Sequence, residues 1–219
     1  LTYRYIVILK LSQYNTSNTF TLCIAGKIES SKIGSIGLPT LPIICEEPTA
    51  FPSGWITPVT SAYFELNQSA IKKYSTGVYF DTIGISRGSD NKFVASIEGI
   101  YKSVNVTFPD SFTFSLYLGD SLLTSNDTVA EGDTLKIVWT SSTNAEKYFI
   151  RINNTFDSVD VNDSLYTWVA NVTGAVTFDL YSSYSSVPNL STTKDVAIVT
   201  YSLAKAKPFE GIQIYIKSQ

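Results

Sequence analysis

Apolar and polar residues alternate with a period of two along most of the chain, and Val, Ile, Thr, Tyr and Phe dominate the alternating segments. Gly, Asn, Asp and Ser interrupt the pattern every eight to twelve residues. This spacing is typical of short strands in an all-β sandwich. It predicts strands at 19–28, 77–85, 92–100, 103–108, 112–118, 134–140, 147–153, 165–169, 175–181, 196–202 and 211–217. Helical character is confined to two short segments, 65–73 and 203–207.

Residues 1–13 show a long alternating strand pattern. The odd positions from 1 to 11 are all apolar, while the even positions are polar except for Ile6 and Ile8. The apolar row consists of Leu1, Tyr3, Tyr5, Val7, Leu9 and Leu11. An unpaired strand of this kind would aggregate, so it needs a partner sheet. Residues 1–13 are either the first strand of their own sandwich or a donor strand that completes a neighbouring subunit.

The rest of the chain is predicted to form two β modules, 14–109 and 110–219, with a boundary near Phe108-Pro109-Asp110. Prolines and glycines crowd the segment 34–58, which is predicted to be an irregular loop because prolines cannot sit in a central strand. From about residue 110 onward the alternating segments, with Trp139 and Trp168 expected in the core, resemble an immunoglobulin-like sandwich. The predicted fold is therefore all-β, with one or more immunoglobulin-like β-sandwich modules preceded by an extended donor strand. A single elongated sandwich is the alternative.

Eight of the twelve asparagines stand in Asn-X-Ser/Thr sequons without a central proline, where chance placement would give roughly three. They are Asn15, Asn67, Asn105, Asn126, Asn153, Asn162, Asn171 and Asn189. This excess predicts an exported protein with N-linked glycans at its turns and solvent faces. None of the sequons lies within residues 1–13.

The charge and residue composition exclude several classes of function. Charged residues make up 16% of the chain and the net charge is −3, which leaves no basic patch for nucleic acid. Histidine is absent, and with it the usual general base and metal ligand, so the chain is not expected to be an enzyme. Asp157, Asp160 and Asp163 lack the spacing of a calcium loop. No catalytic residue, metal or cofactor is expected beyond covalent N-glycans.

The two cysteines, Cys23 and Cys45, fit a single disulfide in an oxidising compartment, or remain two buried thiols. The chain contains no Met, and Leu1 is expected to be a processed N-terminus after removal of a signal peptide. No apolar stretch is long enough to span a membrane. The expected location is extracellular.

The apolar N-terminal strand, the all-β body, the two cysteines and the dense sequons together resemble the archaeal thread pilin of Sulfolobales. The resemblance covers the layout of the whole chain and rests on no short motif. It implies a structural subunit of a glycosylated extracellular filament, in which residues 1–13 complete the neighbouring copy in a head-to-tail homopolymer. The alternatives are a monomeric surface adhesin or carbohydrate-binding β-sandwich, and a virion or surface-layer protein.

Overall fold

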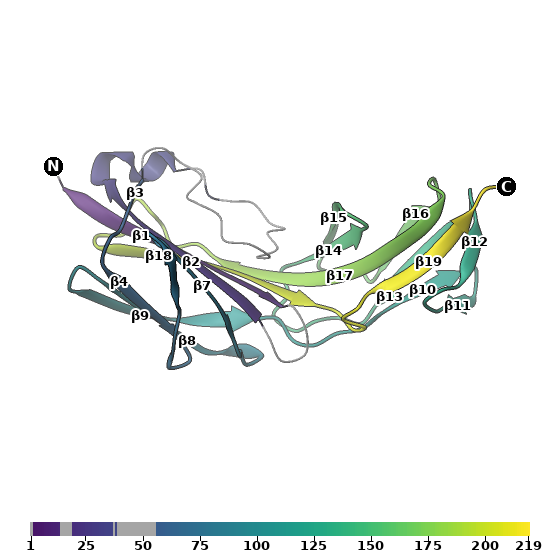
Figure 1. Ribbon diagram of the computed structural model, residues 1–219, viewed down its shortest axis with the longest axis horizontal. Helices are drawn as coiled ribbons and strands as arrows, with labels where there is room; N and C mark the ends of the chain where they lie inside the picture. The colour runs from purple at the N-terminus through teal and green to yellow at the C-terminus, as the bar shows by residue number, and fades with distance from the viewer. Residues whose placement is uncertain (1, 14–18, 37, 39–55) are drawn as a thin grey trace. The chain divides into compact units, whose positions relative to one another are not determined.

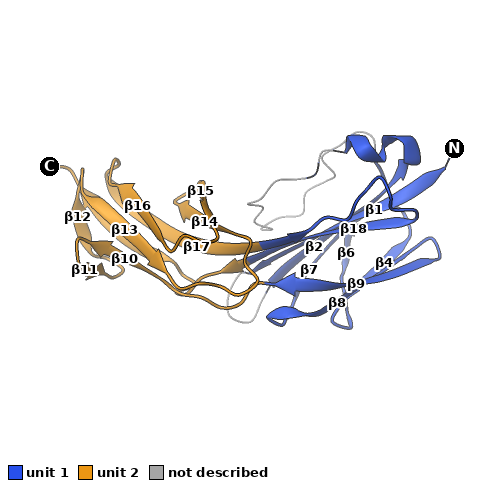
Figure 2. Ribbon diagram, turned by 180° about the vertical axis from the view of Figure 1, so that it is seen from behind, with its two compact units in different colours: residues 1–108, 184–203 blue, residues 109–183, 204–219 orange. Residues whose placement is uncertain are grey.

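A computed structural model describes residues 2–13, 19–36, 38 and 56–219 (Figure 1). The fold is an all-β sandwich, as the alternating pattern predicted, and each predicted strand range overlaps an observed strand. The chain divides into two compact units. Unit 1 comprises residues 1–108 and 184–203, and unit 2 comprises residues 109–183 and 204–219 (Figure 2).

Unit 1 contains two sheets. The first has the strand order β18 (Val196–Lys205), β1 (Tyr3–Gln13), β2 (Thr19–Glu29), β7 (Val78–Ile83), β6 (Lys73–Ser75), with β3 (Thr57–Pro58) also paired to β2. The second has the order β5 (Ser69–Ala70), β4 (Ala62–Leu66), β8 (Gly88–Ile97), β9 (Ile100–Phe108). A 3₁₀ helix, η1 (Ser30–Ser35), follows β2.

Aromatic side chains join the two sheets of unit 1. The ring of Tyr79 on β7 meets the ring of Phe64 on β4 edge-on at 4.7 Å between centroids. Phe64 in turn stacks on Phe93 of β8 at 5.9 Å. All three side chains are buried, and the Tyr79 hydroxyl donates a 3.0 Å hydrogen bond to the Ala62 carbonyl. The buried phenol is thus satisfied, which lets an aromatic with a polar end pack between sheets.

Unit 2 is also built from two sheets. One has the order β12 (Thr128–Ala130), β19 (Ile212–Lys217), β17 (Gly174–Ser186), β14 (Lys147–Ile152), β15 (Thr155–Asp160). The other has the order β11 (Ser121–Leu123), β10 (Phe114–Leu118), β13 (Thr134–Trp139), β16 (Leu165–Val169).

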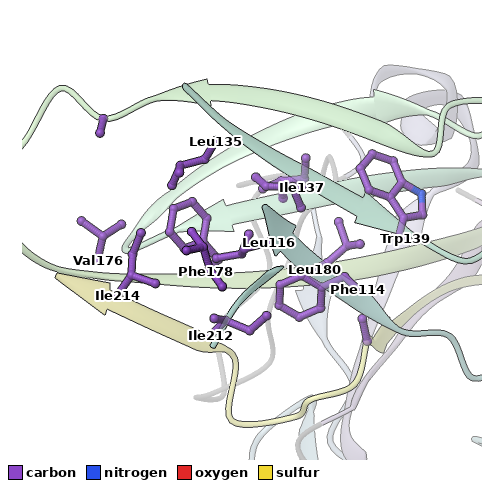
Figure 3. Packing of buried hydrophobic residues seen from close by; sticks show 14 of the residues in the cluster. Phe114, Leu116, Leu135, Ile137, Trp139, Val176, Phe178, Leu180, Ile212 and Ile214 are labelled. Carbon is purple, nitrogen blue, oxygen red and sulfur yellow. The ribbon is translucent and has the colours of Figure 1, made fainter. Parts of the chain in front are cut away.

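The core of unit 2 follows from strict alternation along its strands. On β13 the exposed and buried positions alternate without exception, and Leu135, Ile137 and Trp139 point inward. They pack against Phe178 and Leu180 of β17, which are fully buried (Figure 3). A period of two on each sheet therefore produces one continuous apolar layer between them.

The boundary between the units differs from the predicted modules in one respect. The sequence analysis assigned residues 110–219 to one module, whereas residues 184–203 belong to unit 1. β17 and β18 are 13 and 10 residues long, and both continue from one unit into the other. Residues 196–203 of β18 pair with β1, which explains why this part of the chain belongs to unit 1. The segments 65–73 and 203–207, with helical character in the sequence, lie mainly in β4, β5, β6 and β18.

Replacement of the central core aromatic should strongly destabilise unit 2. Phe178→Ala removes a fully buried side chain, and such truncations cost about 3–5 kcal/mol. Chemical unfolding monitored by far-UV circular dichroism, fitted per transition, measures the loss. Leu165→Ala is the control, because Leu165 is 49% exposed on the outer face of the same unit and should change stability by less than about 0.5 kcal/mol. A similar small change for both variants would contradict the described core.

Candidate functional site

β1 occupies a slot between two strands of unit 1. On one side it pairs antiparallel with β2 over eleven Cα partners, from Tyr3↔Glu29 to Gln13↔Thr19. On the other side it pairs in parallel with β18 over eight partners, from Tyr5↔Val196 to Ser12↔Leu203. The parallel partner is remote in sequence, whereas β2 follows β1 directly. The slot is therefore bounded by one local and one distant strand, and Figure 1 shows the three strands side by side.

Both faces of β1 are buried. Every residue from 5 to 13 is buried, including the polar residues Lys10, Ser12 and Gln13. The even face carries Ile6 and Ile8, which form an apolar cluster with Ile28, Ile33, Ile56, Val199 and Tyr201. The odd face carries Val7, Leu9 and Leu11, each no more than 1% exposed. The strand therefore belongs to the inside of a layered structure, and its two central isoleucines, which broke the alternation in the sequence, are the reason.

The structure of the single chain shows where the predicted donor segment lies when no neighbouring copy is present. In the single chain, residues 3–13 lie in the sheet of their own unit 1, as the alternative interpretation of the sequence allowed. The physical reason is that a strand apolar on both faces cannot stay in water, and the slot beside β2 is the nearest place to bury it. Of the six apolar donor-row residues, Tyr3 is 48% exposed, Leu1 lies outside the described residues, and the other four are buried.

A polar cluster holds the beginning of β1. The Tyr5 hydroxyl donates a short hydrogen bond to Glu98 Oε2, in the turn between β8 and β9. Lys27 Nζ lies 3.5 Å from the same oxygen and over the rings of Tyr3 and Tyr5. The bond to Glu98 raises the pKa of Tyr5 and lowers the pKa of Glu98. Electrostatic interaction with Tyr5 and with the Glu98 carboxylate raises the pKa of Lys27.

Arg87 holds the other end of β1. Its Nη2 donates a 2.8 Å hydrogen bond to the buried Gln13 Oε1, and its guanidinium lies 5.0 Å from the ring centroid of Phe108. A charge-assisted bond to a buried amide is stronger than a neutral one. Both ends of β1 are thus anchored by charged groups on other strands or turns of unit 1, which fixes the register of the strand.

The sequon asparagines occupy exposed positions, with one exception among those described. Six of them are exposed: Asn105, Asn126, Asn153, Asn162, Asn171 and Asn189. Asn126 and Asn153 have positive φ angles of 78° and 52°, which are typical of asparagine in tight turns. Asn15 lies outside the described residues. These six side chains are accessible to an enzyme that attaches a bulky sugar.

Asn67 differs from the exposed sequons because it is half-buried and its amide is engaged on both sides. Its Nδ2 donates a 2.9 Å bond to Asn91 Oδ1, and its Oδ1 accepts a 2.9 Å bond from the Lys92 amide. Asn91 is fully buried and also contacts Ser86 and Val106. A sugar on Asn67 Nδ2 would have to coexist with the bond that this nitrogen makes to the buried Asn91.

Cys23 is buried in β2, and burial raises the pKa of its thiol well above the ordinary value. It has no disulfide partner among the described residues, and Cys45, its predicted partner, lies outside them. Cys23 faces Leu9 as its direct cross-strand partner on β1.

Unit 2 has a pocket of about 240 Å³ at its open edge, between β15 and β16. It is lined by Ile152, Thr155, Asp157, Trp168, Asn171 and Val172. β15 ends one sheet and β16 ends the other, and β15 pairs only with β14 among the described strands. The pocket therefore lies between β15 and β16, the two edge strands, where no backbone pairing between described strands joins the two sheets of unit 2.

Trp168 and Tyr166 both lie on β16, the edge strand beside the pocket. Trp168, expected in the core with Trp139, is instead only partly buried, because β16 is an edge strand. Its ring meets Phe178 edge-on at 5.4 Å. The Tyr166 hydroxyl donates a 2.5 Å hydrogen bond to Asp157 Oδ2 on β15, and this bond raises the pKa of Tyr166 to about 12. The sequence signal for the pocket is the spacing of an aromatic residue and a sequon asparagine, Trp168 and Asn171.

The described residues show no group of three His, Cys, Asp or Glu side chains able to hold a metal ion. Of the three aspartates considered for calcium, Asp157 accepts a bond from Tyr166 and Asp160 accepts bonds from Asn162. Within the same described ranges, no helix has the length and apolar character needed to cross a membrane.

No protein-family model and no curated protein matches the chain. Among solved structures, it is similar to the fibronectin(III)-like modules of Clostridium thermocellum CbhA, with 15% identity and a TM-score of 0.26, over 91% of this chain and 94% of that one. It is also similar to the extracellular domain of a hybrid two-component system from B. thetaiotaomicron, with 9% identity and a TM-score of 0.30, over 94% and 25% of the two chains. A third similar structure is the extracellular domain of a one-component system from the same organism. It has 9% sequence identity and a TM-score of 0.33, over 95% of this chain and 36% of that one. With TM-scores below 0.5, these likenesses transfer no function.

The cluster at the beginning of β1 should make unit 1 sensitive to acid. Because the folded-state pKa of Glu98 is lowered, its contribution is present above the ordinary value of 4.5 and is lost as the pH falls below it. Glu98→Gln and Tyr5→Phe should each reduce the acid dependence of the unfolding midpoint, and the double variant should add nothing further. Glu210→Gln, at an exposed carboxylate of unit 2, is the control. Unchanged acid dependence in Glu98→Gln would contradict the role of the cluster.

The bond between Tyr166 and Asp157 should be lost in alkali. The folded-state pKa of Tyr166 is raised to about 12 from 10.0, so its contribution is complete below pH 10 and disappears as the pH rises towards 12. Tyr166→Phe should therefore narrow the difference in unfolding midpoint between pH 9 and pH 11.5. Tyr215→Phe, at an exposed tyrosine of the same unit, serves as the comparison. Absorbance at 295 nm should show one fewer phenol titrating at about pH 12 in Tyr166→Phe than in the wild type.

Proposed function

We propose that the protein is a structural subunit of a glycosylated extracellular filament, polymerised by exchange of β1 between neighbouring copies. The observation that carries the proposal is the slot between β2 and β18, which β1 fills with backbone pairing on both of its edges. A second copy of the chain carries that same strand and could make the same pairings in the same register. Exchange in one direction gives a head-to-tail contact, which builds an open filament.

The energetics favour exchange over an empty slot. Burying a Val, Leu or Ile side chain is worth about 1.5–3 kcal/mol, so the five aliphatic residues of β1 together contribute on the order of 10 kcal/mol. That is comparable with the whole stability of a typical domain, about 5–15 kcal/mol. A subunit that released β1 without a replacement would therefore not stay folded. The slot must hold either its own β1 or that of a neighbour.

Competition between the two occupants is governed by the linker. A short connection gives the chain's own β1 an effective concentration in the millimolar range, which favours the closed monomer. Residues 14–18, which join β1 to β2, can span at most about 18 Å when extended, at about 3.3–3.6 Å per residue. An exchanged strand must therefore enter a slot close to its own subunit, and assembly needs closely apposed neighbours.

The surface fits an exposed polymer. The exposed sequons lie on strand faces and turns outside β1, so sugars on them would leave the strand pairing undisturbed. With only 16% charged residues, glycans would supply the solubility that charge supplies elsewhere.

Disulfide trapping distinguishes a chain's own β1 from that of a neighbour. Leu9 and Cys23 are direct cross-strand partners, so Leu9→Cys in a Cys45→Ser background places two thiols within disulfide range. Oxidation of the monomer should give an intrachain bond, and oxidation of filaments should give a ladder of covalent oligomers on a non-reducing gel. Ile8→Cys is the matched control, because its side chain points to the opposite face and should trap nothing.

Two negative results, one from disulfide trapping and one from electron microscopy, would have different meanings. Filaments in which Leu9→Cys forms only intrachain bonds would exclude strand exchange and leave the filament itself standing. Native material that shows only particles in electron micrographs would exclude the filament.

A second candidate function, a monomeric carbohydrate-binding adhesin, is favoured by one observation. The pocket beside Trp168 combines an aromatic ring with the polar side chains of Thr155 and Asp157, which is the composition of a small sugar site. This candidate predicts binding of free sugar by the monomer.

A further inference from the structure

The pocket at the edge of unit 2 contains a sequon asparagine in its own wall. Asn171 and Trp168 both line the cavity, although residues three apart on a straight strand would face opposite sides. They share it because β16 ends at Val169 and the chain bends before β17 begins at Gly174, whose φ is +101°. Any group attached to Asn171 Nδ2 therefore starts at the rim of a cavity that holds a partly exposed indole.

We infer that this pocket is the seat of the first sugar of the N-glycan attached to Asn171, with Trp168 as its stacking platform. The inference rests on glycosylation, which is part of the proposed function, but not on strand exchange or filament formation. The ligand that it assigns to the pocket is a sugar attached covalently to the same chain.

The dimensions of the pocket suit one sugar ring. Its volume of about 240 Å³ lies below the range of about 300–1,000 Å³ that is usual for drug-sized ligands. A single monosaccharide fits such a space, while the rest of the glycan would extend into solvent. The covalent link also removes most of the translational entropy cost that a free sugar would pay, so weak contacts are enough to hold the ring in place.

The lining has the chemistry that a sugar ring requires. The electron-rich face of an indole attracts the positively polarised C–H bonds on one side of the ring. The edge contact to Phe178 holds the Trp168 ring in place. Asp157 bonds Tyr166 through Oδ2, and a carboxylate has two acceptor oxygens, so Oδ1 can accept from a sugar hydroxyl. Thr155 adds a hydroxyl, and Ile152 and Val172 supply apolar walls.

Thr173 allows the glycan to be removed without touching the pocket. It completes the sequon of Asn171 but is not among the lining residues. Thr173→Ala prevents glycosylation of Asn171, while Thr173→Ser preserves the sequon. This gives a matched pair in which the pocket itself is constant.

The test is a double-variant cycle in a host that glycosylates sequons, using the wild type, Thr173→Ala, Trp168→Leu and the combination. Glycopeptide mass spectrometry first establishes that Asn171 is occupied. Calorimetry should then show that loss of the glycan lowers the melting temperature of unit 2 by about 2–6 °C when Trp168 is present, and leaves it unchanged in the Trp168→Leu background. Thr173→Ser should behave as the wild type. Acrylamide should quench tryptophan fluorescence more strongly in Thr173→Ala than in Thr173→Ser.

Three results would overturn the inference, and each is distinguishable from failure of the proposed function. Equal effects of Thr173→Ala in both Trp168 backgrounds, with Asn171 occupied, would show that the glycan does not use the ring, while glycosylation itself stands. An empty Asn171 in native protein whose other sequons are occupied would remove the ligand alone. Saturable binding of free N-acetylglucosamine to the wild type with Asn171 occupied, tighter than about 1 mM and lost in Trp168→Leu, would assign the pocket to an external sugar.

Discussion

Burial of β1 on both of its faces is the constraint on which unit 1 depends. A strand of this kind needs a neighbour on each side for its backbone and a covering layer above and below for its side chains. β2 and β18 are the neighbouring strands, and the cluster around Ile6 and Ile8 forms part of the covering layer. The segment 184–203 of unit 1 contains the part of β18 that pairs with β1, and without β18 the slot would have only one wall. The charged groups at Glu98 and Arg87 then fix where the strand starts and stops.

The open edge of unit 2 is a second place where structure and surface chemistry meet. Edge strands with unpaired backbone groups can join other chains, and proteins commonly protect them. The sequons at Asn153 and Asn162 lie on either side of β15, and the sequon at Asn171 follows β16. Bulky sugars at these three positions would flank both edge strands and prevent unwanted pairing there. The sequon density would then protect strand edges in addition to keeping a weakly charged surface in solution.

Much of the fold could be predicted from alternation, because a strand with one face in water shows its period of two directly, as β13 does with Leu135, Ile137 and Trp139. The short strand β12, which pairs in parallel with β19, and β15, whose alternation is broken by exposed polar residues, gave no such signal. Local patterns also could not show that β18 pairs with β1, since that contact joins segments about 190 residues apart. The candidate site was recognisable in part. The apolar strand and the sequons were visible in the sequence, but the pocket depends on a bend after β16 that brings Trp168 and Asn171 to one cavity.

The parallel pairing of β1 with β18 also sets an order of events during synthesis. β1 is made long before Val196, its first partner on β18, so the slot is incomplete while the intervening chain is translated. At about 5–20 residues per second, this interval lasts roughly 10–40 s, far longer than collapse of a short segment. During that time this strand, which is buried on both faces in the finished protein, has only β2 to pair with, and its other edge stays without its parallel partner.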